Sequence, residues 1–338
     1  MTHKLKILTL LTLISCAINA QKFVYDIDFL TFFDNRESRI PSYPSKTLFG
    51  VRLSPEIGFE INDSTYGNHR LMAGASYTQP FGSQWPDIKI RPTIYYRYRQ
   101  QGFDLSLGFV PWRNIRTSLP DYLFSDSLRY FSPNIQGVHF GYSSRHGFAE
   151  FICDWRGMQS PETREAFRLL LTGEYHHQCF FAGGNAQLNH LASRLNAYDG
   201  VCDDITAQPF VGVNFSQLTP LDTLALRTSY ILSYQRERRT NTLYIAHGFL
   251  AELSLKWRFL AVENNLYIGN PLMPLYSQYG PQLNQGETFY QHPIYNKTEF
   301  SVYILQRPFA TLQFSWNLQY VPNHPLAHQQ LLIAQINI

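Results

Sequence analysis

The sequence has few cysteines, little charge and no long apolar run, and each shortage narrows the class of protein. Four cysteines in 338 residues, with Cys16 inside the N-terminal segment, are too few for an exported domain held by disulfides. Only 16% of residues are charged and the formal net charge is +3, which argues against a nucleic-acid partner. The apolar runs are too short for a membrane-spanning helix, so any crossing must be made by strands.

Helical periodicity is scarce as well, whereas aromatic residues are abundant. Thr163–Leu171 is the best helical candidate, but it also fits strand alternation, with Phe167, Leu169 and Leu171 on one side. The chain holds 22 Tyr and 25 Phe, and aromatic residues make up 15% of it. This composition favours an all-β protein.

The first twenty residues have the pattern of a secretory signal peptide. Lys4 and Lys6 precede the short apolar run 7–14, and Ala20 is a small residue suited to cleavage. The segment ending at Cys16 also resembles a lipobox, the site where lipoproteins are cut and acylated. A cut after Ala20 is preferred because strand alternation begins almost at once. We expect a signal peptide over 1–20 and one barrel domain over 21–338.

The clearest alternating element is residues 87–109. Apolar and aromatic residues fill the even positions up to Tyr98, and Lys89, Arg91, Arg97 and Arg99 lie among the polar positions between them. After a tight turn, alternation resumes at Phe103. Successive strand residues point to opposite faces, so this hairpin has one apolar and one cationic face. The apolar face would meet another sheet in a soluble sandwich, or lipid in a closed barrel.

Alternation recurs in about sixteen segments along the chain, and the connections between them are unequal. Connections after odd-numbered segments are generally long, as at 34–46, 113–133 and 270–287, and those after even-numbered segments are short. A sandwich gives no reason for this asymmetry, which is typical of bacterial outer-membrane barrels. We predict a transmembrane, antiparallel, up-and-down β-barrel of about 16 strands, with 14 or 18 as alternatives. Long loops would face outside the cell, with both termini in the periplasm.

Further details agree with a barrel. Trp155 and Trp257 fall on the outward parity near strand ends, where an aromatic girdle would lie. The chain finishes on an alternating strand that resembles the one read by the barrel-assembly machinery, with Ile338 replacing the usual Phe. Cys179 and Cys202 would lie at opposite ends of a strand and should not form a disulfide.

Three motifs carry a family resemblance: Phe33-Asp34-Asn35-Arg36-Glu37, the segment 52–58 (RLSPEIG) and the segment 153–157 (CDWRG). They resemble uncharacterised outer-membrane β-barrel proteins of Bacteroides-type Gram-negative bacteria. More distantly, the layout is similar to porins of the phosphate- and alginate-channel kind. The resemblance implies compartment and architecture and specifies no substrate.

Function would be carried by the inward face, where charges beside a water-filled path could set ion preference. The alternative is that opposite charges on neighbouring strands pair and brace the wall. The cationic stripe from Lys89 to Arg99 exceeds its nearest acids and therefore favours anions. The candidate pore-lining residues are Arg52, Lys89, Arg91, Arg97, Arg99, Asp104, Glu150, Arg168, Arg227, Glu252, Lys256 and Glu263.

The connection 113–133 is apolar for a segment in water. It is expected to fold into the lumen, to cap the rim or to meet a partner. A barrel-embedded lipid hydrolase would need Ser and His presented together, and His139 and His247 stand alone in the sequence. His176 and His177 point oppositely on a strand, so no metal is expected. We therefore expect no enzymatic activity and no cofactor.

The sequence predicts a porin-like channel for passive diffusion of small solutes, with a preference for anions. The alternative is a non-conducting barrel whose loops bind a partner protein or glycan, and the less favoured one is a barrel-embedded lipid hydrolase. Expected partners are outer-membrane lipid, the barrel-assembly machinery and small solutes.

Overall fold

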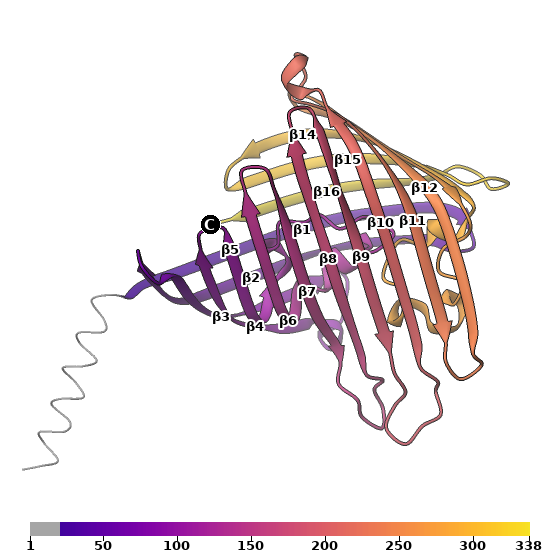
Figure 1. The fold of residues 1–338 in the computed structure, drawn as a ribbon, viewed down its shortest axis with the longest axis horizontal. Helices are drawn as coiled ribbons and strands as arrows, with labels where there is room; N and C mark the ends of the chain where they lie inside the picture. Colours follow the sequence, from indigo (N-terminus) through magenta and orange to yellow (C-terminus); the bar gives the residue numbers. More distant parts are fainter. Residues whose placement is uncertain (1–20) are drawn as a thin grey trace, which may run out of the picture.

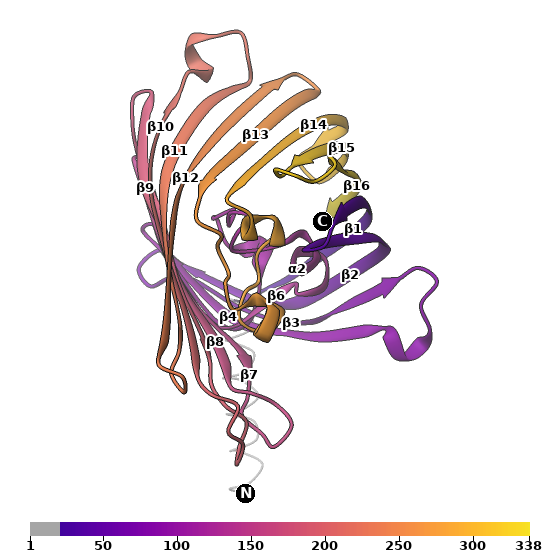
Figure 2. The same ribbon diagram turned by 90° about the vertical axis from the view of Figure 1, so that its right-hand side faces the viewer.

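The structure, a computed structural model, describes residues 21–338, so the expected signal peptide and the two candidate cleavage sites lie outside the described residues. Sixteen antiparallel strands form one closed barrel, in which β16 returns to pair with β1 (Figures 1 and 2). The predicted fold class and strand number are confirmed. None of the helices within residues 21–338 has the length and apolar character needed to cross a bilayer.

The strands are long. They are β1 Gln21–Ile40, β2 Tyr43–Asp63, β3 Gly67–Pro80, β4 Lys89–Gln100, β5 Phe103–Pro111, β6 Asn134–Ser144, β7 Gly147–Gly157, β8 Ala166–His177, β9 Phe180–Leu191, β10 Cys202–Asn214, β11 Thr223–Glu237, β12 Thr242–Trp257, β13 Leu260–Gly269, β14 Ile294–Arg307, β15 Ala310–Tyr320 and β16 Ala327–Asn337. The helical candidate 163–171 therefore lies largely within β8, where its outward apolar residues alternate with inward ones.

The barrel has two unlike ends. Gln21, Ile338 and most of the tight turns lie at one end, here called the turn end, and the longer connections lie at the other, the loop end. The first connection departs from the prediction, because β1 continues to Ile40 and a two-residue turn joins it to β2. The polar run after Phe33 stays in the strand because Asp34 pairs with Arg36 inside, while Asn35 bonds to Gln330 outside.

The outer wall is apolar and the inner wall is mainly polar. Leu53, Leu107 and Leu253 point outward and are each about 40% exposed, as are Trp155 and Trp257 near opposite ends of the barrel. Outward apolar side chains would each cost free energy in water but are stabilised by lipid. Cys179 lies at the turn end and Cys202 at the loop end, and both are free thiols, as the predicted geometry requires.

Two connections at the loop end fold back into the barrel, as Figure 2 shows for α2 and the short orange helices. The first inward loop is residues 112–133, with the 3-10 helix η2 (Trp112–Asn114) and α2 (Asp126–Phe131). The second inward loop is residues 270–293, with α3 (Tyr276–Tyr279), η4 (Gly280–Gln282) and η5 (Thr288–Gln291). Their buried apolar side chains pack with inward residues of the wall to form a hydrophobic core inside the barrel.

Candidate functional site inside and outside the wall

The first inward loop contacts the inner wall on several sides. Arg52 of β2 donates to the carbonyl oxygens of Arg129 (2.8 Å) and Tyr130 (3.2 Å). Lys297 of β14 pairs with Asp121 at 3.0 Å, and Tyr122 donates to Gln208 of β10 at 2.9 Å. Of the three expected placements for 113–133, the structure shows the inward one.

The second inward loop binds the first directly. Ser125 N–H donates to the Gln285 carbonyl at 2.9 Å, and Glu287 N–H donates to the Asp121 carbonyl at 2.7 Å. Gly286 lies against the backbone of Tyr122 so closely that an added Cβ would sit 1.9 Å from the Tyr122 oxygen. The two loops therefore form one plug.

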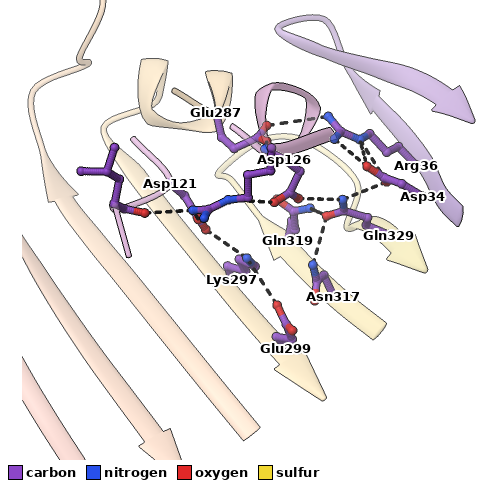
Figure 3. Close-up of polar contacts among 12 residues, drawn as sticks. Asp34, Arg36, Asp121, Asp126, Glu287, Lys297, Glu299, Asn317, Gln319 and Gln329 are labelled. Carbon is purple, nitrogen blue, oxygen red and sulfur yellow. Dashed lines mark hydrogen bonds and ion pairs between the residues drawn. The ribbon is translucent and has the colours of Figure 1, made fainter. Parts of the chain in front are cut away.

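A polar network fixes this plug to the wall, as Figure 3 shows. Arg36 forms a bidentate pair with Asp34 and lies 3.8 Å from Glu287. Gln329 donates to both Asp34 (2.9 Å) and Asp126 (3.1 Å). Burial raises the pKa of Glu287 to about 7, with the charge of Asp126 adding to the shift and that of Arg36 opposing it.

The plug divides the lumen into two large cavities. A loop-end cavity of about 680 Å³ and a turn-end cavity of about 810 Å³ share Trp112 and Phe124 as lining residues. A smaller cavity of about 290 Å³ lies beside Asn114 and Gly141. Such volumes hold ligands of the size of small metabolites.

The structure places all twelve predicted pore-lining residues on the inner face. Four line the turn-end cavity (Arg52, Arg227, Glu252, Glu263), two line the loop-end cavity (Arg91, Arg168), four line the smaller cavity (Arg97, Arg99, Asp104, Glu150), and Lys89 and Lys256 lie near the strand ends. Several form bracing pairs, including Arg97 with Asp104 and Arg227 with Glu252. Their role in guiding ions stays a prediction.

His139 does not stand alone, contrary to the expectation from sequence. Its Nε2 lies 3.1 Å from Glu150 Oε1, and Ser106 is its direct partner across β5 and β6. Glu150 also accepts hydrogen bonds from the N–H groups of Arg116 and Thr117. However, Ser106 is 0% and His139 1% exposed, and neither lines any of the three cavities, so a substrate could not reach either residue. This group fixes the first inward loop to the wall.

A second histidine pair lies on the outer wall at the loop end. His190, near the end of β9, has Nδ1 2.7 Å from Asp203 Oδ1 at the start of β10. Asp203 also accepts from Arg238, at 2.8 Å. The imidazole stacks on Phe167, which in turn stacks on Trp155. A carboxylate that holds Nδ1 leaves Nε2 free to take a proton, which is the arrangement of a general base.

Sequence reasoning missed this pair because its members are separated by the connection 192–201 and meet only through strand register. No group of three or more His, Cys, Asp or Glu side chains in residues 21–338 is arranged to hold a metal ion. His176, considered for such a role, instead lies 2.7 Å from Glu174.

In comparison with solved structures, the fold is similar to the porin-like barrels of outer-membrane proteins. OmpT of Vibrio cholerae is 9% identical and has a TM-score of 0.56, with 94% of this chain and 100% of that chain covered. OpdL of Pseudomonas aeruginosa is 11% identical with a TM-score of 0.56, covering 94% and 99%. OmpF of Salmonella typhi, solved with daunomycin, is 9% identical with a TM-score of 0.53, covering 95% and 99%.

The chain belongs to the lipid A 3'-O-deacylase-type family, whose pattern it matches over residues 17–331. No curated protein matches. The expectation that the protein is not an enzyme is wrong, because this is a family of enzymes. That expectation rested on His139 and His247, which stand alone in the sequence, and it did not consider His190, which strand register brings to Asp203.

Proposed function

We propose that this protein is an outer-membrane esterase that removes an acyl chain from lipid A, with His190 as general base and Asp203 as the residue that orients it. The family supports the reaction and the substrate. The observation that carries the assignment of residues is the 2.7 Å contact of Nδ1 with Asp203 on the outward wall. A reactive group on the outward wall can be reached by a membrane lipid that stays outside the lumen.

In this proposal water is the nucleophile. His190 Nε2 would take a proton from water as the oxygen attacks the ester carbonyl carbon, and the carbonyl electrons would move to the oxygen. The tetrahedral intermediate would then collapse, and the imidazolium would return the proton to the departing sugar oxygen. The products are a fatty acid and a free hydroxyl. Asp203 would stabilise the imidazolium and hold the ring by Nδ1.

The position of the His190–Asp203 pair along the barrel wall suits a lipid A substrate. Trp155 and Phe167 form an aromatic stack next to His190, and aromatic side chains favour the interface between lipid and water. We propose that the loop end faces outward and the termini face the periplasm, as in bacterial barrels of this design. His190 would then lie at the level where the acyl esters of an outer-leaflet glycolipid begin.

The test is release of fatty acid from lipid A in mixed micelles, followed by mass spectrometry. His190→Gln should lower the rate by about a hundredfold or more, which is the usual contribution of a general base, and Asp203→Asn should lower it less. His328→Gln is the matched control, since His328 also lies on the outer wall at the loop end and stacks on Trp316. Equal loss in the His328 and His190 variants, or full activity of His190→Gln, would refute the assignment.

The porin-like channel remains a second candidate because two polar cavities, of about 680 and 810 Å³, occupy the lumen. In this proposal small solutes, anions in particular, would pass when the plug moves, since Trp112 and Phe124 lie between the cavities. Single-channel recording in a planar bilayer tests it. A steady conductance with a reversal potential on the anion side would support the channel, and no current from folded protein would exclude it.

A further inference from the structure

The two lumen cavities differ in how their cations are neutralised. Every Arg and Lys lining the turn-end cavity has a carboxylate within 4 Å, as Arg227 has Glu252 and Lys297 has Asp121. Five arginines line the loop-end cavity, and within residues 21–338 three of them have no carboxylate at that distance: Arg91, Arg156 and Arg164. The loop-end cavity therefore carries an uncompensated positive charge.

The contacts that these arginines do make leave their charge in place. Arg156 donates to the Gln282 carbonyl at 3.1 Å and to the Asn189 side-chain oxygen at 3.3 Å. Arg164 donates to the carbonyls of Ala192 and Gly200. Neutral oxygens satisfy N–H groups but cancel no charge, so the repulsion between neighbouring guanidinium groups persists.

Arg168 is the most confined of the group. It lines the loop-end cavity although it is only 1% exposed, and its guanidinium lies over the rings of Trp112 and Phe124 at 5.2 and 5.3 Å. Its one carboxylate contact, to Asp154, is long at 3.4 Å. Nε and Nη1 of Arg168 have no hydrogen-bond partner among the described residues, and the same holds for Nε of Arg156. Burying cations in this way is costly unless a further anion completes the site.

We propose that the loop-end cavity binds a phosphate group carried on a sugar-like molecule, with Arg168, Arg156 and Arg91 supplying the charge. Guanidinium groups bind phosphate oxygens strongly and with defined geometry. The cavity, at about 680 Å³, is much larger than a phosphate ion, and Asn134, Gln136 and Gln285 add neutral polar groups suited to hydroxyls. This site uses the inner face of the wall and is independent of the proposed deacylation at His190.

Binding to purified, folded protein in detergent is the test, measured by titration calorimetry. The probes are glucose 6-phosphate, inorganic phosphate and uncharged glucose. Glucose 6-phosphate should bind, glucose should not, and Arg168→Gln should weaken binding by about tenfold or more, the expected loss for a charge-assisted contact. Arg156→Gln should also weaken the binding of glucose 6-phosphate. This variant tests the proposal if Arg168→Gln does not fold.

Arg227→Gln is the control, because it removes a lumen arginine that is already paired with Glu252. A second arm compares lipid A with and without its phosphates in the same micelles. Arginine-dependent binding of the soluble sugar phosphate alone identifies a free solute, and arginine-dependent binding of phosphorylated lipid A identifies a headgroup. His190→Gln should retain binding in either arm, which separates this site from the esterase proposal. The proposal is overturned if wild-type protein binds no phosphate-bearing probe, or if Arg227→Gln weakens binding as much as Arg168→Gln.

Discussion

At the scale of single residues, the plug depends on a contact that permits no side chain. Gly286 approaches the Tyr122 carbonyl where a Cβ would lie 1.9 Å from the oxygen. Gly286→Ala should therefore force the two inward loops apart, at a cost of about 1–3 kcal/mol. Limited proteolysis within 270–293 should become faster. Gly184→Ala, where the nearest atom would be 3.2 Å away, is the control, and equal cleavage of both variants would contradict this account.

Glu287 gives the plug a predicted pH dependence. Its pKa is raised to about 7 when buried, whereas an ordinary glutamate titrates near 4.5. Between these values the docked loop holds a proton that the undocked loop releases, so docking is favoured at the acid end and weakens as the pH rises through about 7. Each pH unit in this window is worth at most about 1.4 kcal/mol.

The measurement is the rate of proteolysis within 270–293 from pH 5 to pH 8. At each pH the rate of the wild-type protein is divided by the rate of Glu287→Gln. The variant cannot ionise at this position, so the ratio also removes the pH dependence of the protease. The ratio should rise with pH. A ratio that is flat across the window would contradict this prediction. It would show that ionisation of Glu287 does not weaken docking, because Arg36 and the N–H of Asp126 stabilise the carboxylate.

At the scale of elements, strand alternation in the sequence predicted the wall well and the loops poorly. Residues such as Leu53 and Leu107 follow from alternation because lipid selects one face of every strand. The long β1 did not follow, since its polar segment is stabilised by partners on β2 and β16 that lie far away in sequence. The pairing of His190 with Asp203 was hidden for the same reason.

The outward leucines give a prediction about stability. Leu53→Arg, Leu107→Arg and Leu253→Arg should each destabilise the barrel in lipid by about 2–4 kcal/mol near the midplane. Asn265→Arg is a suitable inner control, because Asn265 lines the turn-end cavity. Thr93 would be a poor control although it faces inward, since it is 1% exposed and accepts a hydrogen bond from Asn134. Equal losses of heat-modifiable gel mobility at both kinds of site would refute the lipid-facing assignment.

At the scale of the whole molecule, the fold is that of a porin-like barrel, but the interior is built like the core of a soluble domain. Tyr122, Leu123 and Phe289 of the inward loops belong to one hydrophobic cluster with wall residues such as Ile152 and Tyr267. The spacing of the alternating segments in the sequence predicted which connections are long. It did not indicate that 270–293 also folds inward, because that depends on its docking to the first loop.

Because the barrel is closed, the order of its strands along the chain could be changed without changing their pairing. Ile27 and Ile338 exchange backbone hydrogen bonds of 2.9 and 3.1 Å, so the two ends of the ring are already neighbours. A linker of about six or more extended residues could join Ile338 to Gln21, which lies six positions before Ile27 on β1, and new ends could be opened in the tight turn at Arg258 and Phe259. Such a circular permutant should keep all sixteen strand pairs and the plug. It would also move the final strand to the middle of the gene, so its assembly in cells would test the expectation that a barrel-assembly machinery reads this strand at the end of the chain.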